Sequence, residues 1–364
     1  MKILFGMPAK DSWGGPIACE PPFVAALHDL GVETAEEIYV YGDKERPTGV
    51  FERIRRVVAT AFRFRHVVKN GSFDVIHLNT AFDLRSLLRD TISIFIMRAK
   101  KAKILLKLHG SDPKSMLTAN AIVRFMIGYL KRRVNGFGVL SNEERKAFSD
   151  LGFPADKLFV VKNAIIMPDI VQKTADWVEK GRDDAFDILF ISRFMPAKGL
   201  LETIRACAIL KRSGISFTLH CVGDGEIREI AEREVTALNL TDNIEFTGYI
   251  PEAEVAKYFR TSDIFVFPTS HIEGLPLALF KAAIAGMPVV TTNIRAAADY
   301  LSEPENCLFC TTEPENIAAN IIKLIGDKAL RQKMRENNVK FGEVFAPPRI
   351  AGEYLEIYTN LTQR

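Results

Sequence analysis

Short apolar runs alternate with longer segments of helical periodicity along almost the whole chain. Each run has the length of a buried strand, and the segments between runs place apolar residues three and four positions apart. This alternation is typical of an α/β fold with parallel sheets, because parallel strands are joined by crossover helices. The predicted strands form two series: 2–7, 36–42, 74–80, 103–110, 136–141 and 158–164, then 187–193, 216–225, 243–249, 263–270, 287–293 and 307–310.

A polar segment near residues 170–186 separates the two series. A chain of 364 residues exceeds one ordinary hydrophobic core, so we expect two domains, residues 1–170 and 186–346. Two prolines then interrupt the pattern, and a last helix is expected at about residues 347–364. Ligands of open parallel sheets bind beyond the carboxyl ends of the strands. The candidate site residues are therefore those that follow strands and face a cleft shared by the two sheets.

The composition is globular, with 48% hydrophobic and 26% charged residues, and no apolar run is long enough for a membrane span or a signal peptide. Five widely spread cysteines fit reduced thiols rather than a disulfide framework. Cys307 and Cys310 form an isolated C-x-x-C motif. Two ordinary thiols are favoured over a metal or redox site, because no second pair or nearby histidine accompanies them. We expect a cytoplasmic protein.

Charge is distributed unevenly between the two predicted domains. Up to residue 170 the chain has 26 Lys and Arg against 18 Asp and Glu, whereas the remainder has 22 against 27. The basic residues of the first domain form clusters at Arg53, Arg55, Arg56, Arg63, Arg65 and Lys69, at Arg98, Lys100, Lys101 and Lys103, and at Lys131, Arg132 and Arg133. Each cluster alone is explained by a solvated helix face, but together they favour peripheral contact with an anionic membrane, at the inner face of the cell membrane. Nucleic acid is less favoured, because no recognised binding module accompanies the charge.

The stretch EGLPLALFKAAIAG carries a candidate anion site. Pro276 suits the start of a helix and Gly286 suits its end, so the free N–H groups at the helix start are expected to point into the cleft. Such a helix start can hold a diphosphate. The Glu273 carboxylate would be repelled by phosphate and instead suits the hydroxyl groups of a sugar. The residues around the turn that we place in this candidate anion site are Gly274, Leu275 and Leu277.

Two cations follow a strand in the stretch FISRFMPAKG. Arg193 can bind a diphosphate bidentately, and Lys198, five residues later, adds a mobile point charge. Surface Arg and Lys are common, so this pair gains weight only from its position beside the other motifs.

Two further strand-end motifs are weaker. Gly14 and Gly15 follow the first strand, where a glycine pair allows close backbone approach to a ligand or forms a simple turn. His109 ends a strand in KLHGSD, and either ligand contact or a structural hydrogen bond explains it.

Taken in order, these motifs resemble the retaining glycosyltransferases of family four, which are related to glycogen synthase and group 1 enzymes. The stretches that carry the resemblance are WGGP, LHGSD, SRFMPAKG, CVGDGEIRE, IEFTGYIP and PTSHIEGLPLALFKAAIAGMPVV. The resemblance covers nearly the whole chain and is strongest between residues 186 and 292. It implies a GT-B fold, in which two Rossmann-like domains face each other and a C-terminal helix crosses back to the first domain.

The resemblance also implies roles for individual residues. Arg193 and Lys198 would hold the diphosphate of the donor, while Glu273 and His109 would contact the transferred sugar. The donor site would include the loop at Gly14 and Gly15, and Gly248, Tyr249 and Ile250 would line the pocket for the base. No D-x-D triad is present, so the resemblance implies chemistry without a metal or other cofactor.

One position departs from the family pattern. The signature places a second glutamate eight residues after the first, where it accepts both ribose hydroxyls of the nucleotide, but this chain has Lys281 there. An ammonium group has no acceptor, so bidentate ribose recognition is lost. Lys281 could reach a phosphate, pair with Glu273, or remain solvated.

Two hypotheses remain open from the sequence. The first is a hexosyltransferase that moves a sugar from a UDP- or GDP-linked donor to a glycan or lipid-linked acceptor held by residues 1–170, in the synthesis of cell-surface polysaccharide or glycolipid. The second is a catalytically degenerate GT-B subunit that binds or scaffolds a partner, which the lysine at position 281 keeps open.

Overall fold

The computed structural model describes residues 1–9, 15–39, 49–99, 101–111, 113–116, 120–166 and 184–364. Contacts between residues divide the chain into two compact units. Unit 1 comprises Met1–Ile166, Ile272–Leu275 and Phe345–Arg364, and unit 2 comprises the rest. The short segment 272–275 is therefore grouped with unit 1, although its neighbours in sequence belong to unit 2.

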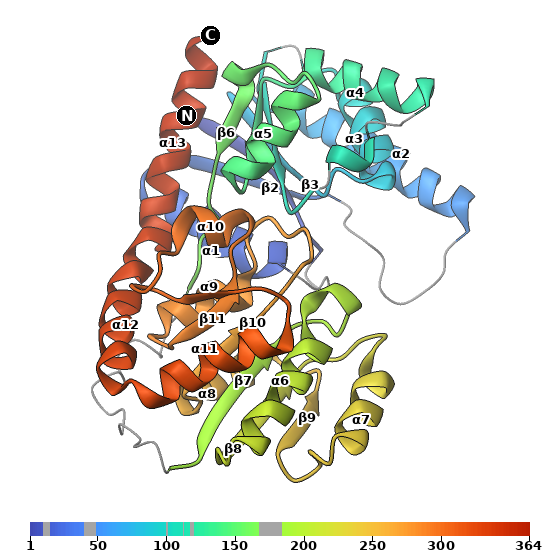
Figure 1. The fold of residues 1–364 in the computed structure, drawn as a ribbon. Coiled ribbons are helices and arrows are strands. Elements are labelled where there is room, and N and C mark those ends of the chain that lie inside the picture. The colour runs from blue at the N-terminus through green and yellow to red at the C-terminus, as the bar shows by residue number, and fades with distance from the viewer. Residues whose placement is uncertain (10–14, 40–48, 100, 112, 117–119, 167–183) are drawn as a thin grey trace. The chain divides into compact units, whose positions relative to one another are not determined.

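Unit 1 is built on a six-stranded parallel sheet in the order β2-β1-β3-β4-β5-β6. Its strands β2, β3 and β6 are labelled in Figure 1. The strands are β1 (Lys2–Met7), β2 (Glu33–Ile38), β3 (Val75–Thr80), β4 (Lys103–Leu108), β5 (Gly136–Val139) and β6 (Leu158–Val160). All six residues of β3 are buried, as expected for a central strand covered on both faces.

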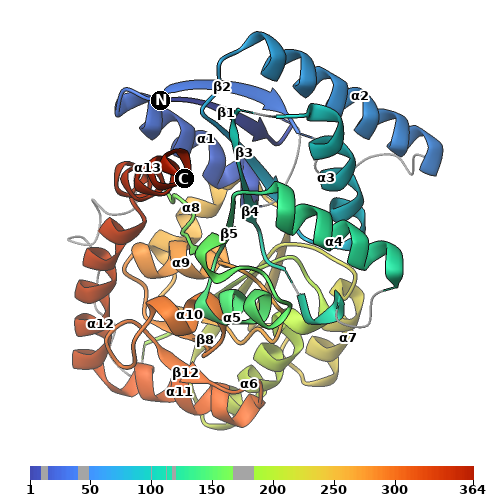
Figure 2. The same cartoon turned by 90° about the horizontal axis from the view of Figure 1, so that it is seen from above.

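Helices cover both faces of this sheet (Figure 2). On one face α1 (Gly15–Asp29) packs against α13 (Pro347–Gln363), with the rings of Phe23 and Tyr354 4.6 Å apart. The other face carries α2 (Val50–Asn70), α3 (Leu84–Met97) and α4 (Ala121–Arg133), which pack in that order. The remaining helical elements of unit 1 are η1 (Pro113–Met116), α5 (Asn142–Asp150) and η2 (Ala155–Lys157).

Unit 2 contains a second six-stranded parallel sheet, in the order β12-β11-β10-β7-β8-β9. Its strands are β7 (Phe186–Ile191), β8 (Phe217–Val222), β9 (Ile244–Gly248), β10 (Ile264–Phe267), β11 (Val289–Thr292) and β12 (Leu308–Cys310). Its helical elements are η4 (Pro196–Lys198), α6 (Leu200–Arg212), α7 (Arg228–Ala237), α8 (Glu252–Thr261), α9 (Leu277–Ile284), α10 (Arg295–Tyr300), α11 (Pro314–Gly326) and α12 (Lys328–Phe341), and the turn η5 (Gly342–Phe345) follows. α11 packs beside α6, and α12 packs beside α9.

Both sheets have the doubly wound strand order, so the predicted α/β class and the two series of strands are confirmed. The prediction was wrong in detail for β2, which begins at Glu33 and ends at Ile38 instead of spanning 36–42. β2 is an edge strand with a largely polar sequence, ETAEEI, and it lacks the apolar run on which the prediction depended. Residues 40–42 lie outside the described residues.

In each sheet there are two neighbouring central strands from which the chain continues toward opposite edges of the sheet. Ligands of doubly wound sheets bind at this switch point. In unit 2 the switch point lies between β7 and β10. The loops that follow these two strands are locked together, because the carbonyl oxygen of Ala197 accepts hydrogen bonds from Ser270 N (2.9 Å), His271 N (3.0 Å) and Thr269 Oγ1 (3.1 Å). Gly199 completes the lock with a φ of +85°, and a Cβ atom there would lie 2.5 Å from the carbonyl oxygen of Pro268.

We predict that Gly199→Ala destabilises unit 2 by more than the left-handed backbone alone explains. The backbone term is about 1–2 kcal/mol for a residue with a side chain, and the contact with Pro268 adds to it. Gly214→Ala is the matched control, because Gly214 has a φ of +73° but nothing within 4 Å of the added Cβ. Denaturant unfolding measures both variants, and equal losses of stability would contradict the proposed lock.

Candidate functional site

The loop after β7 places two cations at the switch point of unit 2. Arg193 follows β7 by two residues, is exposed, and lies with Nε 3.0 Å from Met195 Sδ. Lys198 ends η4 and is 8% exposed, with Nζ 6.0 Å from the centre of the Phe267 ring. The lysine is thus held on the end of β10, whereas the arginine is accessible to a ligand.

The loop after β10 leads into α9, whose start has no side-chain cap. Pro276 is the N-cap residue, and α9 begins at Leu277. The helix therefore starts one residue later than predicted, because Pro276 was expected to be its first residue. Gly286, with a φ of +82°, ends the helix as predicted. The backbone N–H groups of the first turn of α9 therefore remain a possible seat for an anion.

The third loop at this edge of unit 2 follows β9 and contains the predicted base-pocket residues. Gly248 ends β9 with a φ of +73°, and its carbonyl oxygen accepts a hydrogen bond from Gly223 N at 3.0 Å. Tyr249 is 58% exposed and Ile250 is half-buried just before α8. An exposed aromatic ring beside a backbone turn can stack on a planar ligand.

Lys281 lies on α9 and pairs with Glu252, the first residue of α8. The lysine side chain is 12% exposed, whereas that of Glu252 is 68% exposed. This partner differs from Glu273, the partner considered from the sequence. A carboxylate is thus supplied next to position 281 by a neighbouring helix, although residue 281 itself carries the opposite charge.

In unit 1 the predicted His109 follows β4 at the end of the sheet. Its Nε2 lies 2.7 Å from Asn79 Oδ1, at the end of β3, and 3.5 Å from Glu20 Oε1. Both neighbours are acceptors, so Nε2 carries the proton and Nδ1 keeps its lone pair. Burial lowers the pKa of His109, although the nearby Glu20 carboxylate acts to raise it. The imidazole is therefore neutral at neutral pH and can accept a hydrogen bond from a hydroxyl group.

The segment that carries Glu273 is grouped with the same unit as His109. A Cβ atom on Gly110 would lie 2.9 Å from Gly274 N, and one on Gly274 would lie 2.6 Å from Leu140 Cδ1. Glycine is therefore required on both sides of this backbone contact. Within unit 1 the structure thus brings the His109 loop and the Glu273 turn together. Leu275, the next residue, is buried.

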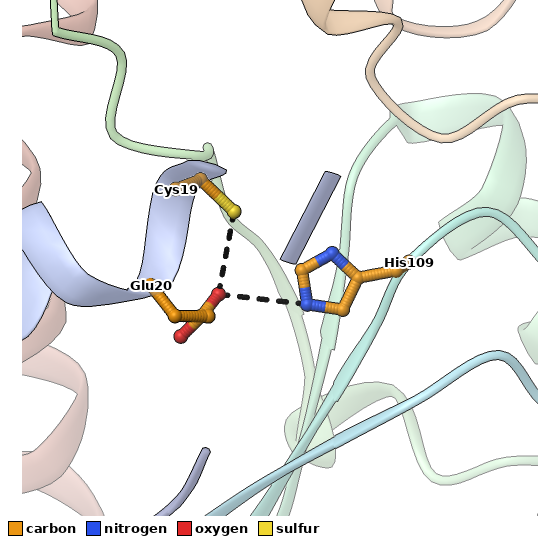
Figure 3. A group of neighbouring side chains, drawn as sticks. All are labelled: Cys19, Glu20 and His109. Carbon is orange, nitrogen blue, oxygen red and sulfur yellow. Dashed lines mark hydrogen bonds and ion pairs between the residues drawn. The ribbon is translucent and has the colours of Figure 1, made fainter. Parts of the chain in front are cut away.

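Behind His109 lies a buried ion pair that the sequence analysis missed. Figure 3 draws its acidic member, Glu20, next to His109. Lys107 Nζ, from β4, donates to Glu20 Oε1, from α1, at 2.7 Å, and both side chains are fully buried. Burial alone would raise the pKa of Glu20, but the Lys107 ammonium and His109 hold it well below its usual range. Glu20 is therefore ionised and keeps a negative charge beside the imidazole.

Aromatic side chains enclose this pair. Lys107 Nζ lies 5.5 Å from the centre of the Phe23 ring and 5.4 Å from that of Tyr354. His77 Nδ1 hydrogen-bonds to the Tyr358 hydroxyl at 2.5 Å, and burial lowers the pKa of His77 to about 3. The residues come from α1, β3, β4 and α13. No local motif signals such a cluster, because its members are distant in sequence.

Cys19, Glu20 and His109 form the only group among the described residues whose ligand atoms are spaced for a metal ion, all within 4.8 Å (Figure 3). The group does not fit a cation well. The Lys107 ammonium is already paired with the Glu20 carboxylate. Burial raises the pKa of the Cys19 thiol, so a thiolate ligand is disfavoured. We assign the cluster to the positioning of His109.

The predicted glycine loop is only partly described. Gly14 lies outside the described residues, and Gly15 is the first residue of α1, at the switch point of unit 1. Cys307 and Cys310, the isolated C-x-x-C pair, are free and buried, and burial raises the pKa of Cys310 to about 12. They behave as ordinary packed thiols.

Two family models match consecutive parts of the chain. The model of Glycosyltransferase Family 4 matches residues 21–166, and that of Glycosyl transferases group 1 matches residues 171–341. The second segment contains all six strands of the unit 2 sheet, and the first contains β2 to β6 of the unit 1 sheet, whose β1 precedes the match.

Curated relatives are also glycosyltransferases. The chain is 30% identical to an amylovoran biosynthesis glycosyltransferase of Erwinia amylovora over 147 residues, 39% of this chain and 35% of the relative. It is 26% identical over 175 residues to a 2-deoxystreptamine N-acetyl-D-glucosaminyltransferase of Niallia circulans, 48% of this chain and 45% of the relative. The matched part thus spans less than half of each of these relatives. An uncharacterized glycosyltransferase of Methanocaldococcus jannaschii is 25% identical over 82% of this chain and 78% of its own.

Solved structures share the fold over the whole chain. The Anabaena protein HepE, in complex with UDP and glucose, has a TM-score of 0.73 and 19% identity, with 99% of each chain covered. Sucrose-phosphate synthase from Thermosynechococcus elongatus has a TM-score of 0.75 and 16% identity, with 99% of this chain and 98% of its own covered. These likenesses confirm the predicted GT-B fold.

We predict that Glu20→Gln destabilises unit 1 by about 3–5 kcal/mol, because it leaves the Lys107 ammonium buried without a counter-charge. The double variant Glu20→Gln/Lys107→Met should recover much of this loss. Because the folded pKa of Glu20 is depressed, its contribution is full above about pH 4.5, its unfolded value, and is lost as the pH falls. Denaturant unfolding between pH 3 and 7 measures this dependence.

The control is Asp150→Asn, which breaks the exposed ion pair with Lys146 in the same unit. It should cause a much smaller loss, because exposed pairs contribute little. Equal losses for Glu20→Gln and Asp150→Asn would show that the buried pair is not a principal constraint.

A separate prediction concerns Lys281 and Glu252. Lys281→Glu and Glu252→Lys each place like charges together and should lower stability, whereas the double exchange should restore the pair. The coupling free energy should be below about 1 kcal/mol, because Glu252 is mostly exposed. Urea unfolding of the four proteins completes the cycle, and strictly additive effects would mean that the ion pair does not form in solution.

Proposed function

Because the chain belongs to the GT-B glycosyltransferases of family 4 and group 1, we propose that it transfers a hexose-type sugar from a nucleotide diphosphate to an acceptor with retention of configuration. The transferase class follows from the family. The sugar class, the donor and the stereochemistry belong to the proposal. The HepE structure contains UDP and glucose, which supports a nucleotide-sugar donor.

The observation that carries the proposal is the cationic loop at the switch point of unit 2. Arg193 is exposed beyond β7, Lys198 is held on Phe267, and the start of α9 follows β10 without a side-chain cap. Two cations and free backbone N–H groups at one sheet edge suit a diphosphate. Negative charge develops on the leaving diphosphate as the glycosidic bond breaks, and fixed cations stabilise that charge. In this proposal no metal ion or other cofactor is required.

The residues of unit 1 would contact the sugar. The neutral imidazole of His109 can accept a hydrogen bond from a sugar hydroxyl through Nδ1, and Glu273 can accept further hydroxyls. Gly15 and Gly274 allow the backbone to approach the donor. The acceptor, a glycan or a lipid-linked sugar, would be held by unit 1. Relatives named for amylovoran and colanic acid biosynthesis support a role in cell-surface polysaccharide synthesis.

The rival function is a degenerate subunit that binds a partner without catalysis. It is favoured by Lys281, which removes the carboxylate of the family signature at that position. The ion pair with Glu252 weakens this argument, because it keeps a carboxylate close to the same place. Donor binding distinguishes the two functions, since a scaffold needs no nucleotide.

We predict that UDP- or GDP-linked sugars stabilise the protein against heat, by about 2.7 kcal/mol at a concentration one hundred times the Kd.

Arg193→Ala and Lys198→Ala should each lower kcat/KM by about 10² to 10³ while the fold is retained. Arg233→Ala, at an exposed position on α7, is the matched control and should leave turnover unchanged.

Two results would reject the assignment. A melting temperature that does not respond to any nucleotide or nucleotide sugar would favour the scaffold. Near wild-type turnover in both the Arg193 and the Lys198 variants would remove these residues from the donor site. Lys281→Glu adds a third comparison, because a change in its donor affinity would place residue 281 at the nucleotide.

A further inference from the structure

The outer face of α2, α3 and α4 in unit 1 combines exposed apolar side chains with a high density of positive charge. The three helices lie side by side on one face of the sheet, with α3 in the middle (Figure 2). Their inner sides are buried on the sheet, as Phe64, Leu87 and Leu130 show. We name the opposite, solvent-facing side the basic helical face.

Large apolar side chains are concentrated on this face. Every exposed phenylalanine among the described residues lies here: Phe51 (83% exposed), Phe62 (56%), Phe95 (61%) and Phe125 (65%). Ile54, Leu84, Leu88 and Ile122 on the same helices are also exposed. Eight of the fifteen exposed large hydrophobic residues of the described chain are therefore on three helices. Such clustering marks an interaction surface, because single exposed apolar residues are normally scattered.

The exposed residues follow helical stripes. On α3, Leu84, Leu88 and Phe95 are spaced by four and seven positions, which places them along one line of the helix. On α2, Phe51 and Phe62 are separated by eleven positions, three helical turns, and share a stripe with Lys69. On α2 the apolar and basic side chains thus point to solvent from the same side of the helix.

The charge of the same helices is almost entirely positive. α2, α3 and α4 contain twelve Lys and Arg residues and only two carboxylates, Glu52 and Asp90. Glu52 is paired with Arg55, and Asp90 is buried beside Arg89. α4 has no acidic residue and ends in Lys131, Arg132 and Arg133. Charge complementarity therefore favours an anionic partner.

We propose that the basic helical face docks on the surface of an anionic lipid bilayer, with its phenylalanine rings inserted among the headgroups. Basic side chains bind anionic headgroups, while exposed Phe, Leu and Ile side chains gain by leaving water for the acyl boundary. Half of the exposed apolar side chains are aliphatic and cannot stack on bases, so a bilayer is favoured over a nucleic acid. No helix among the described residues combines the length and apolar content needed to cross a bilayer.

Vesicle flotation with the full chain tests this proposal. The protein should float with vesicles of phosphatidylcholine and phosphatidylglycerol, and much less with phosphatidylcholine alone. Added salt should weaken the binding, because exposed charges are screened. The variant Phe62→Ser/Phe95→Ser/Phe125→Ser and the variant Arg132→Glu/Arg133→Glu should each lower the partition coefficient by roughly tenfold or more. All five positions are exposed, so the fold should be retained, and circular dichroism checks it.

Matched controls lie on exposed positions of unit 2. Ile230→Ser removes an exposed apolar side chain from α7, and Lys328→Glu/Lys333→Glu reverses two exposed charges on α12. Both should bind vesicles like the wild type. Equal losses in these controls would show that only net charge or hydrophobicity matters, and would overturn the assignment to this face.

Two other outcomes would also overturn the proposal. The first is binding of the wild type to single-stranded or duplex nucleic acid, but not to vesicles, with loss in the same variants. The second is concentration-dependent self-association in sedimentation, abolished by the phenylalanine variant, without vesicle binding. None of these measurements uses sugar transfer, so failure here is distinguishable from failure of the proposed enzymatic activity.

Discussion

The buried ion pair between Glu20 and Lys107 is the constraint on which the organisation of unit 1 depends. It joins α1 to the centre of the sheet through a 2.7 Å charge-assisted hydrogen bond that no water can reach. Two charges removed from water are costly, so the pair persists only where the surrounding geometry satisfies it. Phe23 and Tyr354 close over the ammonium, which ties α13 to the same cluster. The chain end is thereby packed around a polar centre rather than around a purely apolar one.

This centre has a direct effect on the candidate site. Glu20 and Asn79 both face Nε2 of His109, so the tautomer of the imidazole is fixed by residues that a ligand need not touch. In unit 2 the corresponding role falls to the backbone, since Ala197 and Gly199 hold the cationic loop against the loop after β10. One unit therefore orients its site through buried charge, and the other through backbone hydrogen bonds and a glycine.

Much of this fold could be predicted from the sequence because strand length, helical periodicity and turn residues are local signals. The apolar runs located the buried strands, and Pro276 with Gly286 marked the ends of α9. β2 was misplaced because an edge strand needs only one neighbour and can be polar. The Glu20–Lys107 pair joins residues 87 positions apart, and Lys281 joins Glu252 across 29 positions. Neither contact has a local pattern, so only the three-dimensional structure reveals it.

All five cysteines of the chain are buried and free, each inside the packing of its own unit. Burial raises the pKa of every one of these thiols, which keeps them protonated and unreactive toward electrophiles in solution. A cysteine introduced at a chosen surface position would thus be the preferred target of a maleimide probe while the native residues stay in place. The arrangement of the two units is accordingly open to measurement by site-directed fluorescence or spin labelling in an otherwise unaltered chain.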